Sequence, residues 1–173
     1  MQWSKLRSLV ESRFTESLRK RVSIHSTAYG NCSCGHAWIT LDGEVIANFC
    51  TRAHYQKLAD ERANRPTPVA STKKYETQFV EYGEMSRQDV YQACWRFIHD
   101  LSIEQALSDS DILVLSLAVL DQRIGKRRMQ GLALEYLPPL PRHLLEIRAV
   151  AEGISLPPQP NPPLNSDPTA TAC

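Results

Sequence analysis

Glycine is scarce in this 173-residue chain, which has only seven, and the glycine-dependent motifs of common enzyme classes are missing. The sequence contains no Gly-x-Ser-x-Gly nucleophile elbow, no phosphate-binding loop and no Gly-x-Gly-x-x-Gly fingerprint, and it lacks the His-Glu-x-x-His pattern of zinc proteases. His99 and Asp100 have serines nearby but no such motif around them, so we expect His99 near the C-terminal end of a helix, at its polar edge. A hydrolase of a familiar class is therefore not indicated.

The chain also lacks an excess of charge and a long apolar run. Its 20 Lys and Arg oppose 19 Asp and Glu, which gives a formal net charge of +1 and does not favour nucleic acid or anionic lipid. No segment reaches the roughly 18 consecutive apolar residues of a membrane span, and the N-terminus is unlike a signal peptide. We expect a cytoplasmic protein without a membrane partner, whose five cysteines are free or metal-bound rather than disulfide-paired.

The strongest structural signal is a β-hairpin over residues 36–49. Alternating strand-forming residues flank Asp42-Gly43, and glycine accepts the positive φ that a type I′ turn requires. A first strand is predicted at Val22–Thr27 from the same alternation, and Tyr75–Tyr82 is predicted to be an edge strand or an extended arm. These segments predict a small antiparallel sheet.

Helical periodicity dominates the remaining sequence. The predicted helices cover Ser4–Leu18, Arg52–Ala63, Ser86–Leu101, a short segment after Ser102, Ser110–Ile124 and Arg142–Glu152. Ser86 and Asp89 have the spacing of a capping box, and Gly125 suits the C-cap of the most apolar helix. That helix is the expected centre of the helical half.

The C-terminal segment is rich in proline. Six prolines follow Gly153, with Asp167 the only charged side chain, so this segment cannot assemble a core. The sequence therefore predicts a single α+β domain over residues 1–152, with an N-terminal helix, an antiparallel sheet and a C-terminal helical half. Residues 153–173 are predicted to be a disordered tail.

Metal-ligand residue types gather around the hairpin, at Cys32, Cys34, His36 and Cys50. Structural zinc sites use pairs two to four residues apart, whereas one residue separates Cys32 from Cys34. A two-residue turn also pairs His36 with Phe49, which places His36 and Cys50 on opposite faces unless a bulge intervenes. We therefore expect partly buried residues at strand ends rather than a metal site, and no cofactor.

A reactive cysteine is a second hypothesis. Cys50 ends a strand immediately before a predicted helix start, where the helix N-terminus favours the thiolate. His54 lies one turn further on and could act as the base, with Arg52 available for an anion. No specific motif supports this arrangement, and a cysteine at a strand end is more often inert packing.

Two basic clusters raise a third hypothesis, contact with nucleic acid. The clusters are Arg19, Lys20 and Arg21, and Lys126, Arg127 and Arg128. Together they could contact phosphates. Each cluster also follows a predicted helix end, where positive charge complements the helix dipole. The sequence contains no recognisable DNA-reading module.

Several segments resemble a family of small uncharacterised bacterial proteins. They are Trp3-Ser4-Lys5-Leu6-Arg7, Ile24-His25-Ser26-Thr27, Cys32-Ser33-Cys34-Gly35 with Trp38-Ile39-Thr40, Ile46 to Ala53, Ser86-Arg87-Gln88-Asp89, and Leu120 to Arg128. The resemblance covers residues 1–152. It implies a bacterial cytoplasmic setting and an accessory gene, such as those on mobile elements, and it carries over no activity, cofactor or catalytic residue.

We interpret the sequence as a non-enzymatic accessory or regulatory protein that acts by binding another protein, because no catalytic constellation stands out. The apolar helical half and the proline-rich tail are the segments in which a partner site could lie. Two alternatives remain open: a small thiol-dependent enzyme that uses Cys50 and His54, and a DNA-associated regulator that uses the basic clusters.

Overall fold

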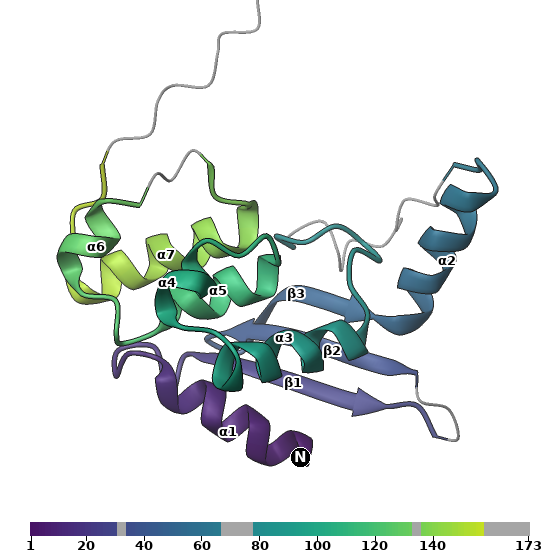
Figure 1. Cartoon of the computed structure of the whole chain (residues 1–173), viewed down its shortest axis with the longest axis horizontal. Coiled ribbons are helices and arrows are strands. Elements are labelled where there is room, and N and C mark those ends of the chain that lie inside the picture. The colour runs from purple at the N-terminus through teal and green to yellow at the C-terminus, as the bar shows by residue number, and fades with distance from the viewer. Residues whose placement is uncertain (31–33, 67–77, 133–135, 158–173) are drawn as a thin grey trace, which may run out of the picture.

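The computed structural model describes residues 1–30, 34–66, 78–132 and 136–157, and it shows the predicted α+β fold. The elements in chain order are α1 (Trp3–Arg13), β1 (Val22–Ala28), β2 (Gly35–Leu41), β3 (Glu44–Cys50), α2 (Thr51–Arg62), α3 (Arg87–His99), α4 (Ile103–Leu107), α5 (Ile112–Leu120), α6 (Lys126–Gln130) and α7 (Pro139–Glu152). Helices α1 and α3 pack against the sheet, α5 packs between α3 and α7, and α2 extends away from the body (Figure 1).

The three strands form an antiparallel sheet in the order β1-β2-β3, and the predicted hairpin is confirmed. Asp42 and Gly43 have φ values of 51° and 89°, the left-handed conformation at both central positions that a type I′ turn needs. Because the turn holds the two strands in a tight ribbon, it fixes the side of the sheet on which each side chain of β2 and β3 lies.

The predicted hairpin register is wrong beyond the turn. The pairing shifts between Ile39 and Thr40, so that Ile46 is the extra residue of a β-bulge on β3. As a result His36 lies opposite Cys50, not opposite Phe49. A one-residue shift changes the face of every later side chain, and His36 and Cys50 now share a face.

The core lies between the sheet and the helical half. Alternate strand residues on the inner face, such as Ile24, Ile39 and Phe49, are buried together with apolar residues of α3, α5 and α7. Helix α5 has eight buried residues out of nine and occupies the centre of the helical half, as its apolar sequence predicts. One continuous cluster of buried side chains joins these elements.

The start of α3 confirms the predicted capping box. The Ser86 side chain accepts a hydrogen bond from the Asp89 backbone N–H, and the Asp89 carboxylate accepts one from the Ser86 backbone N–H. Both contacts satisfy donors that a helix N-terminus otherwise leaves unpaired. The sequence alone therefore fixes where this helix begins.

Two helices end earlier than the sequence predicts, for a shared reason. Helix α1 stops at Arg13 and α5 stops at Leu120, because the segments that follow them pair with each other. The Thr15 N–H donates to Leu120 O (3.1 Å), and the Gln122 N–H donates to Arg13 O (2.8 Å). These long-range hydrogen bonds replace the helical ones that local periodicity predicts.

The shorter α5 changes the role of Gly125. It is the N-cap of α6 and not the C-cap of the preceding helix, so the prediction for this glycine is wrong. At the other end of the helical half, α7 begins at Pro139, before the predicted start at Arg142, because proline suits the first turn of a helix.

Two predictions fall partly outside the described residues. Of the tail, residues 158–173 are not described, and of the segment Tyr75–Tyr82 the structure describes only residues 78–82, which form no strand. Phe79 nevertheless donates a backbone hydrogen bond to Ile46 O at 3.0 Å, so the chain here runs beside the bulge of β3. Among the helices of the described ranges, none has the length and apolar character needed to span a bilayer.

Candidate functional site

The cysteines near the hairpin are in different states. Cys34 is disulfide-bonded, whereas Cys50 and Cys94 are free. The expectation that the cysteines are unpaired is therefore wrong for Cys34. Cys32 lies outside the described residues. Within the ranges that the structure describes, no three His, Cys, Asp or Glu side chains gather as a metal ion would need.

Cys50 lies where the sequence places it, but its predicted partner does not face it. Cys50 is the N-cap of α2, and its Sγ lies 3.9 Å from the Tyr29 hydroxyl. In His54, Nδ1 lies 2.9 Å from Gly83 O, and Nε2 lies 3.8 Å from an Asp89 carboxylate oxygen. Both ring nitrogens of His54 are thus directed at the segment that leads into α3.

The face of the sheet opposite α1 and α3, here called the outer face, brings together polar and aromatic side chains. Its central members are His25, His36, Trp38, Asn48 and Cys50. The Trp38 ring is stacked between the two imidazoles, with its centroid 5.0 Å from each of theirs. His36 Nε2 forms a short hydrogen bond with Asn48 Oδ1. The bulge in β3 is what places Asn48 and Cys50 on this face beside His36.

The two basic clusters are engaged in local contacts. Arg21 forms a two-point ion pair with Asp42, and Arg128 forms a single contact with Glu104 at 2.8 Å. Arg19 donates to the backbone carbonyls of Ser12 and Phe14 at the end of α1, and Lys126 donates to Glu152 O. Lys20 and Arg127 are exposed. Acidic partners thus neutralise two of the six charges, Arg21 and Arg128, which weakens the attraction of the clusters for phosphates.

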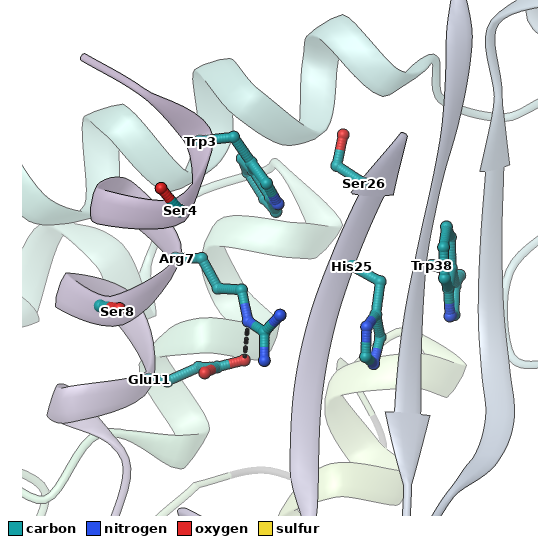
Figure 2. A pocket seen from close by; sticks show the side chains of 8 residues that line it. All are labelled: Trp3, Ser4, Arg7, Ser8, Glu11, His25, Ser26 and Trp38. Atoms are coloured by element: carbon teal, nitrogen blue, oxygen red, sulfur yellow. Dashed lines mark hydrogen bonds and ion pairs between the residues drawn. The ribbon is translucent and has the colours of Figure 1, made fainter. Parts of the chain in front are cut away.

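A pocket of about 290 Å³ lies between α1 and the β1 edge of the sheet (Figure 2). Eight side chains line it: Trp3, Ser4, Arg7, Ser8, Glu11, His25, Ser26 and Trp38. Arg7 and Glu11 point from the helix toward β1, and His25 and Trp38 stand on the strands across from them (Figure 2). The pocket therefore combines two indole rings with an ion pair and an imidazole.

Glu11 connects helix α1 to strand β1 in this pocket. One of its oxygens, Oε1, accepts a hydrogen bond from Arg7 Nε at 2.9 Å and another from the Ile24 backbone N–H at 3.0 Å. Ile24 lies on β1, which is an edge strand of the sheet that the described residues form, so its outward N–H groups have no neighbouring strand there. The carboxylate thus satisfies an edge-strand donor and fixes α1 against the sheet.

Acidification is expected to weaken this fold through two histidines. Burial lowers the pKa of His25 and that of His143, and the positive charge of Arg7 lowers the pKa of His25 further. The unfolded chain then takes up protons from about pH 6.5 downward while the folded chain does not, so the free energy of unfolding falls as the pH drops through this value. The contribution of these two histidines levels off only below their folded-state pKa values.

Urea unfolding between about pH 8 and about pH 5 measures this decline. The His25→Gln, His143→Gln double variant should show a flatter dependence than the natural chain. An unchanged slope in the double variant would contradict the assignment.

Sequence reasoning missed Trp3, His25, Trp38 and Asn48 as site residues, because they belong to no motif. Strand alternation was a usable signal, since it puts His25, His36 and Trp38 on one face. Asn48 could not be placed in the same way, because its face depends on the bulge.

Comparison with known protein families matches residues 2–149, nearly the whole described region. Comparisons with curated proteins and with solved structures found no match. The family match spans α1, the sheet, the outer face and most of α7. By this match the chain belongs to the SF0329 protein family.

Proposed function

We propose that this protein is an accessory or regulatory protein of the bacterial cytoplasm that acts by binding another protein through the pocket between α1 and the sheet. The observation that carries the proposal is a pocket whose lining combines Trp3, the Arg7–Glu11 ion pair and Trp38. The bacterial setting rests on the sequence resemblance alone. The free thiols of Cys50 and Cys94 agree with a reducing compartment, whereas the disulfide at Cys34 does not.

The residue types that line the pocket favour a protein partner. Tryptophan and arginine most often dominate the free energy of protein interfaces. Trp3, Arg7 and Trp38 are all partly exposed, so a partner could cover them on binding. The pocket would receive one planar side chain of the partner beside the Trp3 indole and the Arg7 guanidinium.

Blocking the pocket is expected to abolish partner capture. Ser8 is exposed on α1 and lines the pocket, so Ser8→Trp fills the pocket without touching the core. Affinity capture from the native host with quantitative mass spectrometry should show a partner that the natural chain retains and Ser8→Trp loses by about tenfold or more, a free-energy cost above ~1.4 kcal/mol.

Lys5→Trp provides the matched control. Lys5 is exposed on the same helix and does not line the pocket. Capture should survive this change, and both variants should melt near the temperature of the natural chain. Equal capture by Ser8→Trp and the natural chain would contradict the proposal.

A further inference from the structure

We propose that Cys50, His36 and Asn48 form a nucleophilic thiol site on the outer face, which takes acyl groups from ester or thioester substrates. None of these three residues lines the pocket between α1 and the sheet, although Trp38, which does, stacks on the His36 ring. The inference does not depend on the protein-binding proposal. It replaces the pairing of Cys50 with His54 that the sequence suggests.

The β-bulge creates the site. With Ile46 inserted, His36 lies directly opposite Cys50 across the antiparallel pair. Residues in this relation have Cβ atoms roughly 4.5–5.5 Å apart on the same face of the sheet. The register therefore makes the imidazole and the thiol neighbours on one face, and a base within reach of a thiol is the requirement for a cysteine nucleophile.

Asn48 orients the imidazole. Its Oδ1 can only accept a hydrogen bond, so its contact with His36 Nε2 assigns the proton of the neutral ring to Nε2. Nδ1 is then the basic nitrogen of His36. A third group that fixes the tautomer of the base completes the nucleophile–base–orienter arrangement that recurs in cysteine enzymes.

The NH₂ group of the Asn48 amide indicates a position for a ligand. Asn48 is 7% exposed, and its Nδ2 is one of two buried side-chain nitrogens in the described ranges without a hydrogen-bond partner. A buried donor left without an acceptor costs about 1–3 kcal/mol. The carbonyl oxygen of a substrate bound at Cys50 would accept this hydrogen bond and remove the cost.

Two further groups can stabilise negative charge on that oxygen. The Tyr29 hydroxyl lies 3.9 Å from Cys50 Sγ, and the Arg52 guanidinium carbon lies 5.1 Å from the Tyr29 ring centroid. Cys50 also caps the 12-residue helix α2 without a side-chain capping hydrogen bond, so the positive end of the helix faces the thiol. The Tyr29 hydroxyl and the N-terminus of α2 therefore lie beside the thiol that would carry the acyl group.

The reaction that these residues support is a two-step acyl transfer. In the first step His36 Nδ1 takes the thiol proton, Sγ bonds to the substrate carbonyl carbon, and the bond to the leaving oxygen or sulfur breaks as that atom receives the proton. In the second step water attacks the thioester, His36 takes the water proton, and the acid and the free thiol are released. The steps involve no oxidation or reduction.

Cys94 is the internal reference for this chemistry. It is fully buried in the core, and burial raises the pKa of its thiol well above the ordinary value. It should react with neither an electrophile nor an ester in the folded protein. The labelling of Cys50 can therefore be compared with that of Cys94 in the same protein.

The test uses the full chain with p-nitrophenyl acetate and iodoacetamide as probes. Nitrophenol release should proceed with transient acetylation of Cys50, seen by peptide mass spectrometry, and it should vanish in Cys50→Ser. His36→Gln should slow release by roughly 10²–10⁴-fold, the usual contribution of a general base, whereas His54→Gln should change it by less than about threefold. Added imidazole should restore part of the rate lost in His36→Gln.

Asn48→Asp separates the two roles of Asn48. The carboxylate keeps an acceptor for His36 but removes the buried N–H donor, so alkylation of Cys50 by iodoacetamide should persist while ester turnover falls by roughly 10²-fold or more.

The proposal is overturned if Cys50 is not acetylated, if His36→Gln retains the natural rate while folded, or if His54→Gln loses as much. If His36→Gln does not fold, Asn48→Asp replaces it: unchanged ester turnover in that variant would overturn the proposal. Lys5→Trp, on the exposed side of α1, should leave ester turnover unchanged.

Discussion

Replacement of Arg148 by methionine is expected to lower the free energy of unfolding by about 3–5 kcal/mol, because it removes one partner of a buried charged network. Arg148 is 2% exposed, and its guanidinium donates to three backbone carbonyls, those of Val119, Asp121 and Ile124, at 2.6–3.0 Å. Its Nε also pairs with a carboxylate oxygen of Glu152 at 2.8 Å.

These carbonyls explain the size of the effect. They belong to the end of α5 and the turn behind it, where the chain no longer forms helical hydrogen bonds. Methionine would fill much of the volume but leave Val119 O and Ile124 O buried without donors, each at a cost of about 1–3 kcal/mol, whereas Asp121 O keeps its hydrogen bond from the Ile124 N–H. Arg148 therefore connects α7 to the C-terminal end of α5 and to the turn that follows it.

Equilibrium unfolding in urea measures the loss. Arg127→Met is the matched control, since Arg127 is exposed on α6 and the same change there should cost less than about 0.5 kcal/mol. Equal stabilities of Arg148→Met and Arg127→Met would show that the buried guanidinium does not support the turn.

The Phe97→Ala variant should lose about 3–5 kcal/mol, the usual cost of removing a buried phenylalanine ring. Phe97 is 1% exposed on α3, the helix that packs against both the sheet and α5. Because α3 joins the two halves of the core, neighbouring side chains cannot close the cavity without moving the helix. The loss therefore includes both the transfer of the ring to water and the empty volume.

Phe97→Leu provides the comparison for this variant, because it keeps most of the apolar volume and should cost far less than Phe97→Ala. Urea midpoints of the two variants, compared at equal m-values, check the prediction. A loss below about 1 kcal/mol for Phe97→Ala would mean that α3 does not bridge the two halves in the way the structure shows.

The sequence predicted the elements whose signals are local. The hairpin turn at Asp42-Gly43 and the capping box of Ser86 and Asp89 appear as predicted, because each depends on residues within four positions of one another. The ends of α1 and α5 could not be predicted in this way. They are set by hydrogen bonds between residues 13–15 and 120–122, which lie far apart in the chain.

The candidate site was predicted only in part. Strand and helix signals correctly placed Cys50 at the junction of β3 and α2. Local spacing favoured His54 as its partner, since one helical turn separates the two. The structure directs His54 toward Gly83 and Asp89, and it brings His36 opposite the thiol instead.

By itself the sequence determined the α+β class, the hairpin and the position of Cys50 before a helix, since these follow from alternation, turn chemistry and helical periodicity. Only the tertiary structure decided which side chains meet. The bulge at Ile46 moves the later residues of β3 to the face opposite the one that an uninterrupted hairpin would give them. It thereby places Asn48 and Cys50 with His36 on the outer face. A bulge is stabilised by contacts with the surrounding chain, here the hydrogen bond from Phe79 to Ile46, and no local pattern in the hairpin encodes that partner.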